Sequence, residues 1–188
     1  MKLVLASKSP RRKEILSRVV SDFEVRVSNA EEIYPSDTPP YEIPKILAEI
    51  KALAVPMRDD EIIIGSDTVV ISHDGKIMGK PTDRDDAISM LTNLTSHPHE
   101  VVSGVCVRSS KKVYSAYEVT RVFMKNVPLD EICKYIDEEK PYDKAGAYGI
   151  QEGAGEFVEK IEGDFNNVVG LPLSLLLKIL KDEFDIEL

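Results

Sequence analysis

The chain has 188 residues, of which 43% are hydrophobic and 30% charged, and its formal net charge is −9. This length and composition are typical of one folded domain or of two small lobes. The negative net charge disfavours binding to nucleic acid or to an anionic membrane surface. We find neither a secretory leader nor an apolar run of 18 residues, and therefore expect a cytoplasmic protein without membrane spans.

The predicted elements alternate between strands and helices. Predicted strands cover residues 2–6, 23–27, 61–72, 100–108, 112–124 and 157–163, and predicted helices begin at residue 10, near residue 41, after residue 81, at residue 129 and at residue 172. Between them, residues 28–40, 142–155 and 164–170 are interpreted as loops. A short polar turn joins the strands 100–108 and 112–124, which makes them antiparallel partners. The pattern predicts a mixed α/β fold rather than a strict βαβ alternation.

The first predicted helix begins with an unusual group of charges. Ser9 is a suitable N-cap and Pro10 a suitable first helical residue, so Arg11 and Arg12 occupy the second and third positions. Cations are disfavoured at the positive end of a helix dipole unless an anion is also there. A phosphate chain would bind the free backbone N–H groups and both guanidiniums. The alternative is a solvated basic face paired with nearby carboxylates.

Asp67 follows the apolar run "EIIIG". Gly65 and its neighbours predict an interruption of the strand 61–72 here, so that Asp67 lies where a strand ends and a loop opens. A carboxylate in such a place can hold a divalent metal or activate water, although an Asx turn is the plainer interpretation. Thr68 is either a hydrogen-bond donor to a ligand or the start of the next strand.

Other candidates are single polar residues beside glycine or proline loops. They are the carboxylates Glu31 and Glu32, the lysines Lys51, Lys80 and Lys144, and Gln151, whose amide can read a base edge. Each also has a plain interpretation as a solvated loop residue. There is no Walker motif, no G-x-G-x-x-G and no G-x-S-x-G, so ATPases of the P-loop type, Rossmann dehydrogenases and serine hydrolases lack support. Cys106 and Cys133 show no metal-type spacing and are expected to be reduced.

Taken together, several segments resemble the Maf family of nucleoside triphosphate pyrophosphatases. They are "LASKSPRR" (5–12), "KA" (51–52), "IGSDTVV" (64–70), "GKP" (79–81), "DKAGAYGIQ" (143–151) and "NVVGLPL" (167–173), in the family's order. The resemblance implies one Maf-like domain over residues 1–188, with a mixed elongated sheet flanked by helices. It also implies two lobes with a central groove, as in the inosine triphosphate pyrophosphatase or Ham1-like fold.

The same resemblance implies roles for individual residues. It makes Asp67 the base that activates water, with Ser7, Arg11, Arg12, Lys51 and Lys80 around the phosphates. It makes Asp67 and Glu32 ligands of a divalent cation, Mg²⁺ or Mn²⁺, although the adjacent Glu31 leaves that register open by one residue. Asn166 and Asn167 lie in a loop that departs from the family pattern.

The "SDT" motif resembles the branch of the family that acts on dTTP and UTP, with Arg11, Thr68 and Gln151 as the specificity positions. The expected activity is therefore that of a nucleoside triphosphate diphosphatase, releasing a monophosphate and pyrophosphate, with modified pyrimidine nucleotides as further candidate substrates. A homodimer is common in the family. Two alternatives stay open: a nucleotide-binding regulator of septum formation without turnover, and a nucleotidyl- or phosphotransferase.

Overall fold

A computed structural model describes residues 2–188 and divides the chain into two compact units. The first unit contains the segments up to Thr68, Ser103–Glu118 and Asn166–Leu188. The second contains Val69–Val102 and Val119–Phe165. Among the described residues, no helix is both long and apolar enough to span a bilayer.

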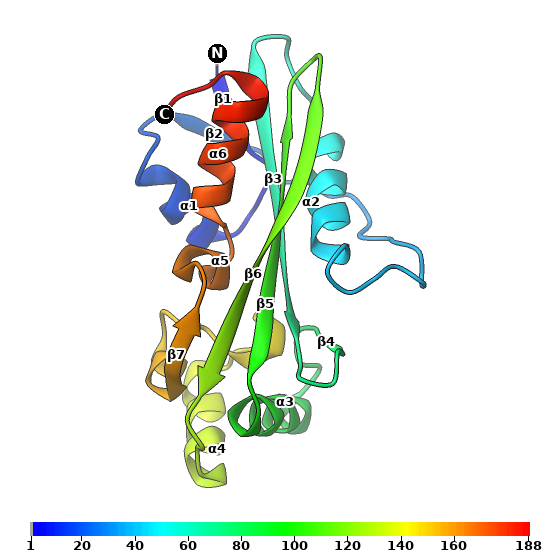
Figure 1. The fold of residues 1–188 in the computed structure, drawn as a ribbon. Coiled ribbons are helices and arrows are strands. Elements are labelled where there is room, and N and C mark those ends of the chain that lie inside the picture. The colour runs from blue at the N-terminus through cyan, green and yellow to red at the C-terminus, as the bar shows by residue number, and fades with distance from the viewer. Residues whose placement is uncertain (1) are drawn as a thin grey trace. The chain divides into compact units, whose positions relative to one another are not determined.

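The strands of the described residues belong to one seven-stranded sheet. They are β1 (Lys2–Leu5), β2 (Phe23–Val25), β3 (Glu61–Ile71), β4 (Ile77–Met78), β5 (His99–Arg108), β6 (Val113–Met124) and β7 (Val158–Glu162). Their order is β2-β1-β3-β5-β6-β7, with β4 paired to β3 (Figure 1). Strand β1 runs parallel to β2 and β3, whereas β4 is antiparallel to β3 and β7 to β6. The sheet is therefore mixed, which confirms the predicted fold class.

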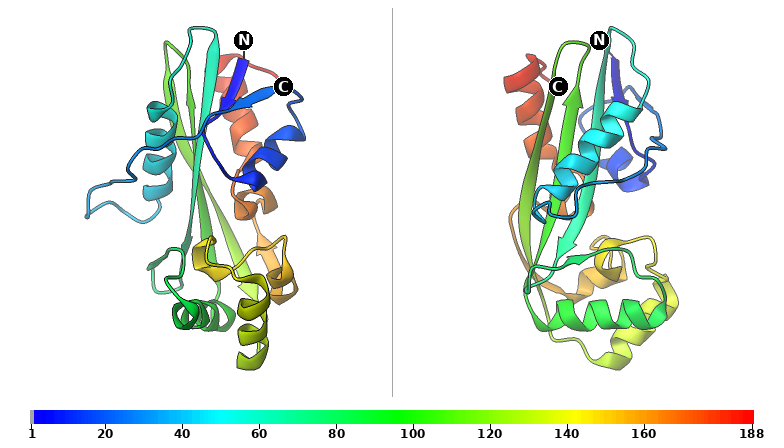
Figure 2. Two further views of the ribbon diagram at one scale, coloured as in Figure 1. Left: turned by 180° about the vertical axis from the view of Figure 1, so that it is seen from behind. Right: turned by 90° about the vertical axis from the view of Figure 1, so that its right-hand side faces the viewer.

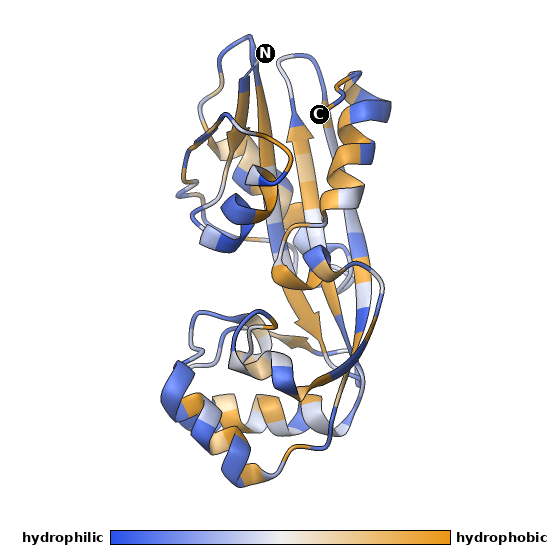
Figure 3. Cartoon of the chain, turned by 90° about the vertical axis from the view of Figure 1, so that its left-hand side faces the viewer, coloured by the Kyte–Doolittle hydropathy of each residue, from blue (hydrophilic) through white to orange (hydrophobic). Residues whose placement is uncertain are grey.

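The helices are α1 (Pro10–Ser17), α2 (Ile43–Ala54), α3 (Arg84–Ser96), α4 (Leu129–Glu139), α5 (Phe165–Val169) and α6 (Leu173–Phe184). Two short 3₁₀ turns, η1 (Ala145–Ala147) and η2 (Gly153–Phe157), lie between α4 and β7. In the first unit, α2 covers one face of the strands, and α1 and α6 cover the other (Figure 1, Figure 2). Apolar residues run along the strands, while polar and apolar residues alternate on α6 (Figure 3).

Helix α2 packs closely against the sheet. Val4 of β1 and Ile63 of β3 are fully buried in a cluster with Ala48 and Ala52 of α2. A Cβ atom at Gly65 would lie 2.2 Å from the carbonyl oxygen of Ala48, so only glycine permits this approach. The predicted interruption of the strand at Gly65 is therefore wrong: β3 is continuous, and the glycine accommodates the helix backbone that lies on it.

The second unit holds α3, α4 and both 3₁₀ turns. Asp83 caps α3 by accepting a hydrogen bond from the backbone N–H of Asp86 at 2.9 Å, and α3 buries Ala87, Leu91 and Leu94. His99, at the start of β5, is buried and lies 2.8 Å from the hydroxyl of Tyr148 through its Nε2 atom. This pair anchors the glycine-rich segment that follows α4.

Two segments interpreted as loops contain short helices instead. The segment 142–155 includes η1 and the start of η2, and the segment 164–170 includes α5. Gly170 follows α5 with a φ of +127°, and both its N–H and that of Leu171 donate to the carbonyl of Asn166, each at 3.0 Å. These contacts close a compact turn that hydropathy alone does not reveal.

Candidate active site

The start of α1 has the predicted form. The backbone of Ser9 is extended, its hydroxyl accepts a hydrogen bond from the backbone N–H of Arg12 at 3.5 Å, and Pro10 is the first helical residue. Arg11 and Arg12 therefore stand in the first turn, beside backbone N–H groups that have no partner within the helix. This is the end of a helix that attracts anions.

The guanidinium of Arg12 is held on three sides by uncharged oxygen atoms. Its Nε donates to the carbonyl of Gly170 at 2.8 Å, Nη1 to the hydroxyl of Ser7 at 3.3 Å and Nη2 to the hydroxyl of Thr68 at 3.3 Å. Burial lowers the pKa of Arg12, and the nearby charge of Arg11 lowers it further, whereas the carboxylate of Asp67 raises it. Three of its five N–H bonds are used in this way, which leaves one on each terminal nitrogen for a ligand.

A second group of charges surrounds Lys51, in the last turn of α2. Its Nζ atom bonds to Oδ1 of Asp67 and lies 3.0 Å from Oε1 of Glu32. Asp67 is buried, whereas the side chain of Glu32 is 52% exposed. Of the two neighbouring glutamates in the loop before α2, Glu32 is the one placed beside Lys51.

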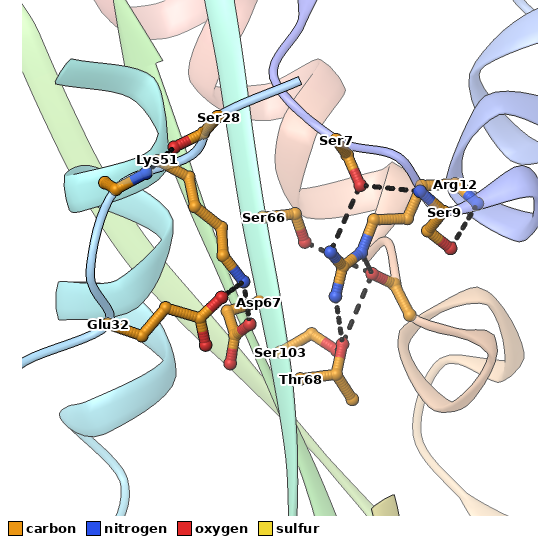
Figure 4. A network of polar contacts seen from close by, with 12 residues as sticks. Ser7, Ser9, Arg12, Ser28, Glu32, Lys51, Ser66, Asp67, Thr68 and Ser103 are labelled. Atoms are coloured by element: carbon orange, nitrogen blue, oxygen red, sulfur yellow. Dashed lines mark hydrogen bonds and ion pairs between the residues drawn. The ribbon is translucent and has the colours of Figure 1, made fainter. Parts of the chain in front are cut away.

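The alternation of β3 separates these two groups. Asp67 points to the face covered by α2, while its neighbours Ser66 and Thr68 point to the face of α1 and bond to the carbonyl of Gly170 at 3.1 and 3.3 Å. Figure 4 shows the carboxylates with Lys51 on one side of β3 and Arg12 with its hydroxyl partners on the other. The sequence prediction that Asp67 lies at a strand end is wrong, because β3 continues to Ile71.

The pairing of β1 with β3 stops just before the residues that carry the two groups. The pairing of β1 with β3 ends at Leu5 and Ile64, followed by one more bond from the N–H of Ala6 to the carbonyl of Ile64 at 2.8 Å. Beyond that point β1 no longer covers the edge of β3, and the next residues, Gly65 to Thr68, carry the two groups on their opposite faces. Both groups therefore belong to the part of β3 that is not paired with β1.

Residues 2–183 match a family model described as Maf-like protein. The chain belongs to the Maf family. It is 48% identical to a protein named dTTP/UTP pyrophosphatase from Thermoanaerobacter sp. (strain X514), over 100% of both chains. It is 46% identical to a protein of the same name from Parabacteroides distasonis, over 96% of this chain and 95% of that one.

Among solved structures, the Ham1 protein of Staphylococcus aureus is similar to this Maf-family chain. The TM-score is 0.50 at 12% identity, and the match covers 67% of this chain and 73% of that one. A likeness at this identity concerns the fold alone. It confirms the predicted similarity to the Ham1-like fold.

Asp67 and Glu32 are the two carboxylates expected to hold a divalent cation. In the described part of the chain, no group of three or more His, Cys, Asp or Glu side chains could hold an ion. Mg²⁺ and similar ions, however, are often bound by one or two carboxylates together with substrate phosphates. Asp67 and Glu32 already converge on one cation, the ammonium of Lys51. The pair therefore fits a divalent cation shared with a phosphate ligand.

The remaining candidates belong to the second unit. Lys80 and Gln151 are exposed, and their segments are linked by a hydrogen bond from the N–H of Gly146 to the carbonyl of Gly79 at 3.0 Å. Lys144 is instead buried and bonds to Asp143 at 2.8 Å and Glu152 at 3.0 Å. Lys144 thus has a structural role within its own loop.

Sequence reasoning missed three groups around Arg12: the hydroxyls of Ser66 and Ser103 and the carbonyl of Gly170. Ser103 bonds to the hydroxyl of Thr68 at 2.8 Å and to the carbonyl of Asn167 at 2.9 Å. The sequence does hold one signal for Ser103, since it is the polar residue in the otherwise apolar run "VVSGVCV". Nothing in the local sequence identifies the carbonyl of Gly170.

Proposed function

We propose that this chain hydrolyses dTTP and UTP to the nucleoside monophosphate and pyrophosphate, with Mg²⁺ or Mn²⁺ as cofactor. The observation that carries the proposal is the placement of a cationic group and a carboxylate group on opposite faces of one strand, at an edge that β1 leaves uncovered. Hydrolysis of a triphosphate requires cationic groups that bind the phosphates and carboxylates that hold a cation and activate water. The names of the full-length relatives support the choice of dTTP and UTP.

Arg12 and the start of α1 bind the phosphates in this proposal. The guanidinium is already oriented by Gly170, Ser7 and Thr68, so little side-chain freedom is lost when a phosphate binds. None of these three partners carries a charge, and the remaining N–H bonds, one on each terminal nitrogen, match two phosphate oxygens. Ser7 and Arg11 extend the same surface along the helix start.

Asp67 prepares the attacking water. Lys51 bonds to one oxygen of the carboxylate and fixes its orientation, and the other oxygen is then available to take a proton from water. A divalent cation held by Asp67 and Glu32 would neutralise charge on the phosphate oxygens. Water attacks the α-phosphorus, its proton passes to Asp67, and the bond from the α-phosphorus to the bridging oxygen breaks.

The leaving pyrophosphate carries away that bridging oxygen and the negative charge of the bond. Arg12 and Arg11 on α1 stabilise this charge as it develops, and this is where most of the rate enhancement in phosphoryl transfer arises. Arg11 and Thr68 select the nucleotide in this proposal. The working unit is a single Maf-like domain with both compact units, either alone or as a homodimer.

The test is an assay of product release with purified full-length protein. Each of dTTP, UTP, CTP, ATP and GTP is incubated with Mg²⁺, Mn²⁺ or EDTA, and monophosphate and pyrophosphate are separated by chromatography. We expect equal amounts of both products from dTTP and UTP, loss of turnover in EDTA, and incorporation of ¹⁸O from labelled water into the monophosphate.

Other results would contradict the proposal in distinguishable ways. Tight binding of UTP without product release would indicate a regulatory nucleotide-binding protein. Turnover only after addition of an acceptor other than water would indicate a transferase. Label in the pyrophosphate would mean that water attacks the β-phosphorus instead.

A further inference from the structure

Ser103 is a fully buried serine in the middle of β5, between Val102 and Gly104. Burying a hydroxyl costs free energy unless the group is hydrogen-bonded. Ser103 Oγ has two partners, the carbonyl of Asn167 at 2.9 Å and the hydroxyl of Thr68 at 2.8 Å. It therefore links α5 to β3, the strand that carries Asp67.

The chemistry of these partners fixes the direction of the hydrogen bonds. A carbonyl only accepts, so the one proton of Ser103 goes to Asn167. Ser103 must then accept from Thr68, and the proton of Thr68 points at Ser103. The lone pairs of Thr68 are left facing Nη2 of Arg12, which donates to them at 3.3 Å. The result is a directed chain from Arg12 through Thr68 and Ser103 to Asn167.

The carbonyl of Gly170 is a weaker alternative for the proton of Thr68. It lies 3.3 Å from Thr68, but it already accepts from Arg12 Nε at 2.8 Å and from Ser66 at 3.1 Å. A carbonyl oxygen has two lone pairs, and both are taken by closer donors. Because Ser103 accepts the proton of Thr68, Thr68 can accept from Arg12 and does not need to donate to the carbonyl of Gly170.

We propose that Ser103 is a positioning residue for phosphate binding: it orients the hydroxyl of Thr68, which in turn holds the guanidinium of Arg12. The inference rests on the proposed function in one respect, namely that Arg12 binds the phosphates. Ser103 is fully buried and bonds to Thr68, so its effect on a phosphate passes through Thr68. Loss of the Ser103 hydroxyl loosens one of the three bonds that orient Arg12 before substrate arrives.

The test is a double-mutant cycle with Ser103→Ala, Thr68→Val and the combined variant, measured with UTP. Loss of one such hydrogen bond corresponds to about a tenfold change in an equilibrium constant. We expect Ser103→Ala to raise KM about tenfold while kcat falls less than threefold, and to change KM less than twofold when Thr68 is already valine. Ser115→Ala is the matched control and should leave KM unchanged. Ser115 lies on the neighbouring strand β6, and its partly buried hydroxyl donates to Glu49 of α2.

A purely structural serine would give a different pattern, because Ser103→Ala would then raise KM by the same factor in both backgrounds or leave it unchanged. Either result overturns the inference. Ser103→Cys repeats the test with nearly the same volume and a poor hydrogen-bonding group, in case the alanine variant does not fold.

Binding of inorganic pyrophosphate, measured by titration calorimetry on the same proteins, separates this inference from the proposed function. Its Kd should follow the same pattern as KM. If the wild-type protein hydrolyses no nucleotide but binds pyrophosphate, the proposed function fails and the cycle in Kd still decides the role of Ser103. If the wild-type protein does not bind pyrophosphate, the phosphate-binding role of Arg12 fails, and this inference fails with it.

Discussion

Asp67 and Thr68 are consecutive residues of β3 that bond to opposite sides of the sheet. Asp67 pairs with Lys51 of α2, and Thr68 accepts from Arg12 of α1. The two-residue period of a strand makes this separation unavoidable. One short stretch can therefore carry both the carboxylate proposed to activate water and the hydroxyl proposed to orient a phosphate-binding arginine, each hydrogen-bonded on its own face of the sheet.

The first prediction concerns the base. Replacing Asp67 with asparagine keeps the shape but removes the proton acceptor, so we expect kcat with UTP to fall by about 10³-fold. The product-release assay measures kcat, and circular dichroism checks that the variant is folded. Asp137→Asn is the control, because that carboxylate lies on α4 in the second unit, pairs with Arg84 and should leave kcat unchanged. Retention of wild-type kcat by Asp67→Asn would rule out Asp67 as the base.

The second prediction concerns Lys51 as the cation between two carboxylates. Lys51→Gln leaves Asp67 and Glu32 without their shared positive charge, so we expect the free energy of unfolding to fall by about 2 kcal/mol. Mn²⁺ should then raise the Tm of this variant more than that of the wild type, because the bare carboxylates attract the ion. Lys45→Gln, on the same helix and paired with Glu42, is the control. Equal Tm increments in all three proteins would contradict a cation site at Asp67 and Glu32.

The third prediction concerns the geometry of Arg12. Its three donors contact three separate acceptors, and the single nitrogen of a lysine cannot stand in all three places. We expect Arg12→Lys to raise KM for UTP at least about tenfold and to lower the Tm. Arg18→Lys is the comparison, since Arg18 is exposed and pairs with Glu14 in the same helix. An unchanged KM in Arg12→Lys would show that only the charge matters.

The fourth prediction concerns the packing of α2 on β3. Gly65→Ala places a Cβ atom against the carbonyl oxygen of Ala48 and must push helix and strand apart. We expect a loss of about 3 kcal/mol in the free energy of unfolding, measured by urea denaturation. Gly79→Ala is the control for stability, because a Cβ there meets nothing within 4 Å. Equal stability of the two variants would refute the close approach.

The fifth prediction concerns acid sensitivity. Burial lowers the pKa of His99 from 6.5 to about 4. Between these pH values His99 is protonated in the unfolded chain but neutral in the folded protein. Stability is therefore lost as the pH falls from 6.5 towards 4, by about 2 kcal/mol at pH 5. His99→Gln should remove this part of the pH dependence, measured as Tm between pH 7 and 5. His97→Gln, at an exposed position, should retain it.

Features that depend on neighbouring residues follow from the amino-acid sequence alone. The cap at Ser9, Pro10 at the first helical position and the burial of Leu91 on α3 obey local rules of capping and periodicity. The sequence motifs are also sufficient to indicate the Maf family. They point to Ser7, Arg12, Thr68, Lys51 and Asp67 as site residues, but a motif carries no information about the contacts that its members make.

Which of these residues meet depends on the packing of elements that are distant in the chain. Arg12 takes acceptors from Thr68 and Gly170, 56 and 158 positions away, and such contacts leave no trace in local patterns. Glycine often interrupts strands, so the local sequence predicts a break at Gly65. In the fold, Gly65 instead allows the backbone of α2 to approach the strand, and the sequence near Gly65 does not contain that helix. The face of β3 that each side chain occupies, and with it the division between Asp67 and Thr68, arises from the packing of α1 and α2 on opposite sides of the sheet.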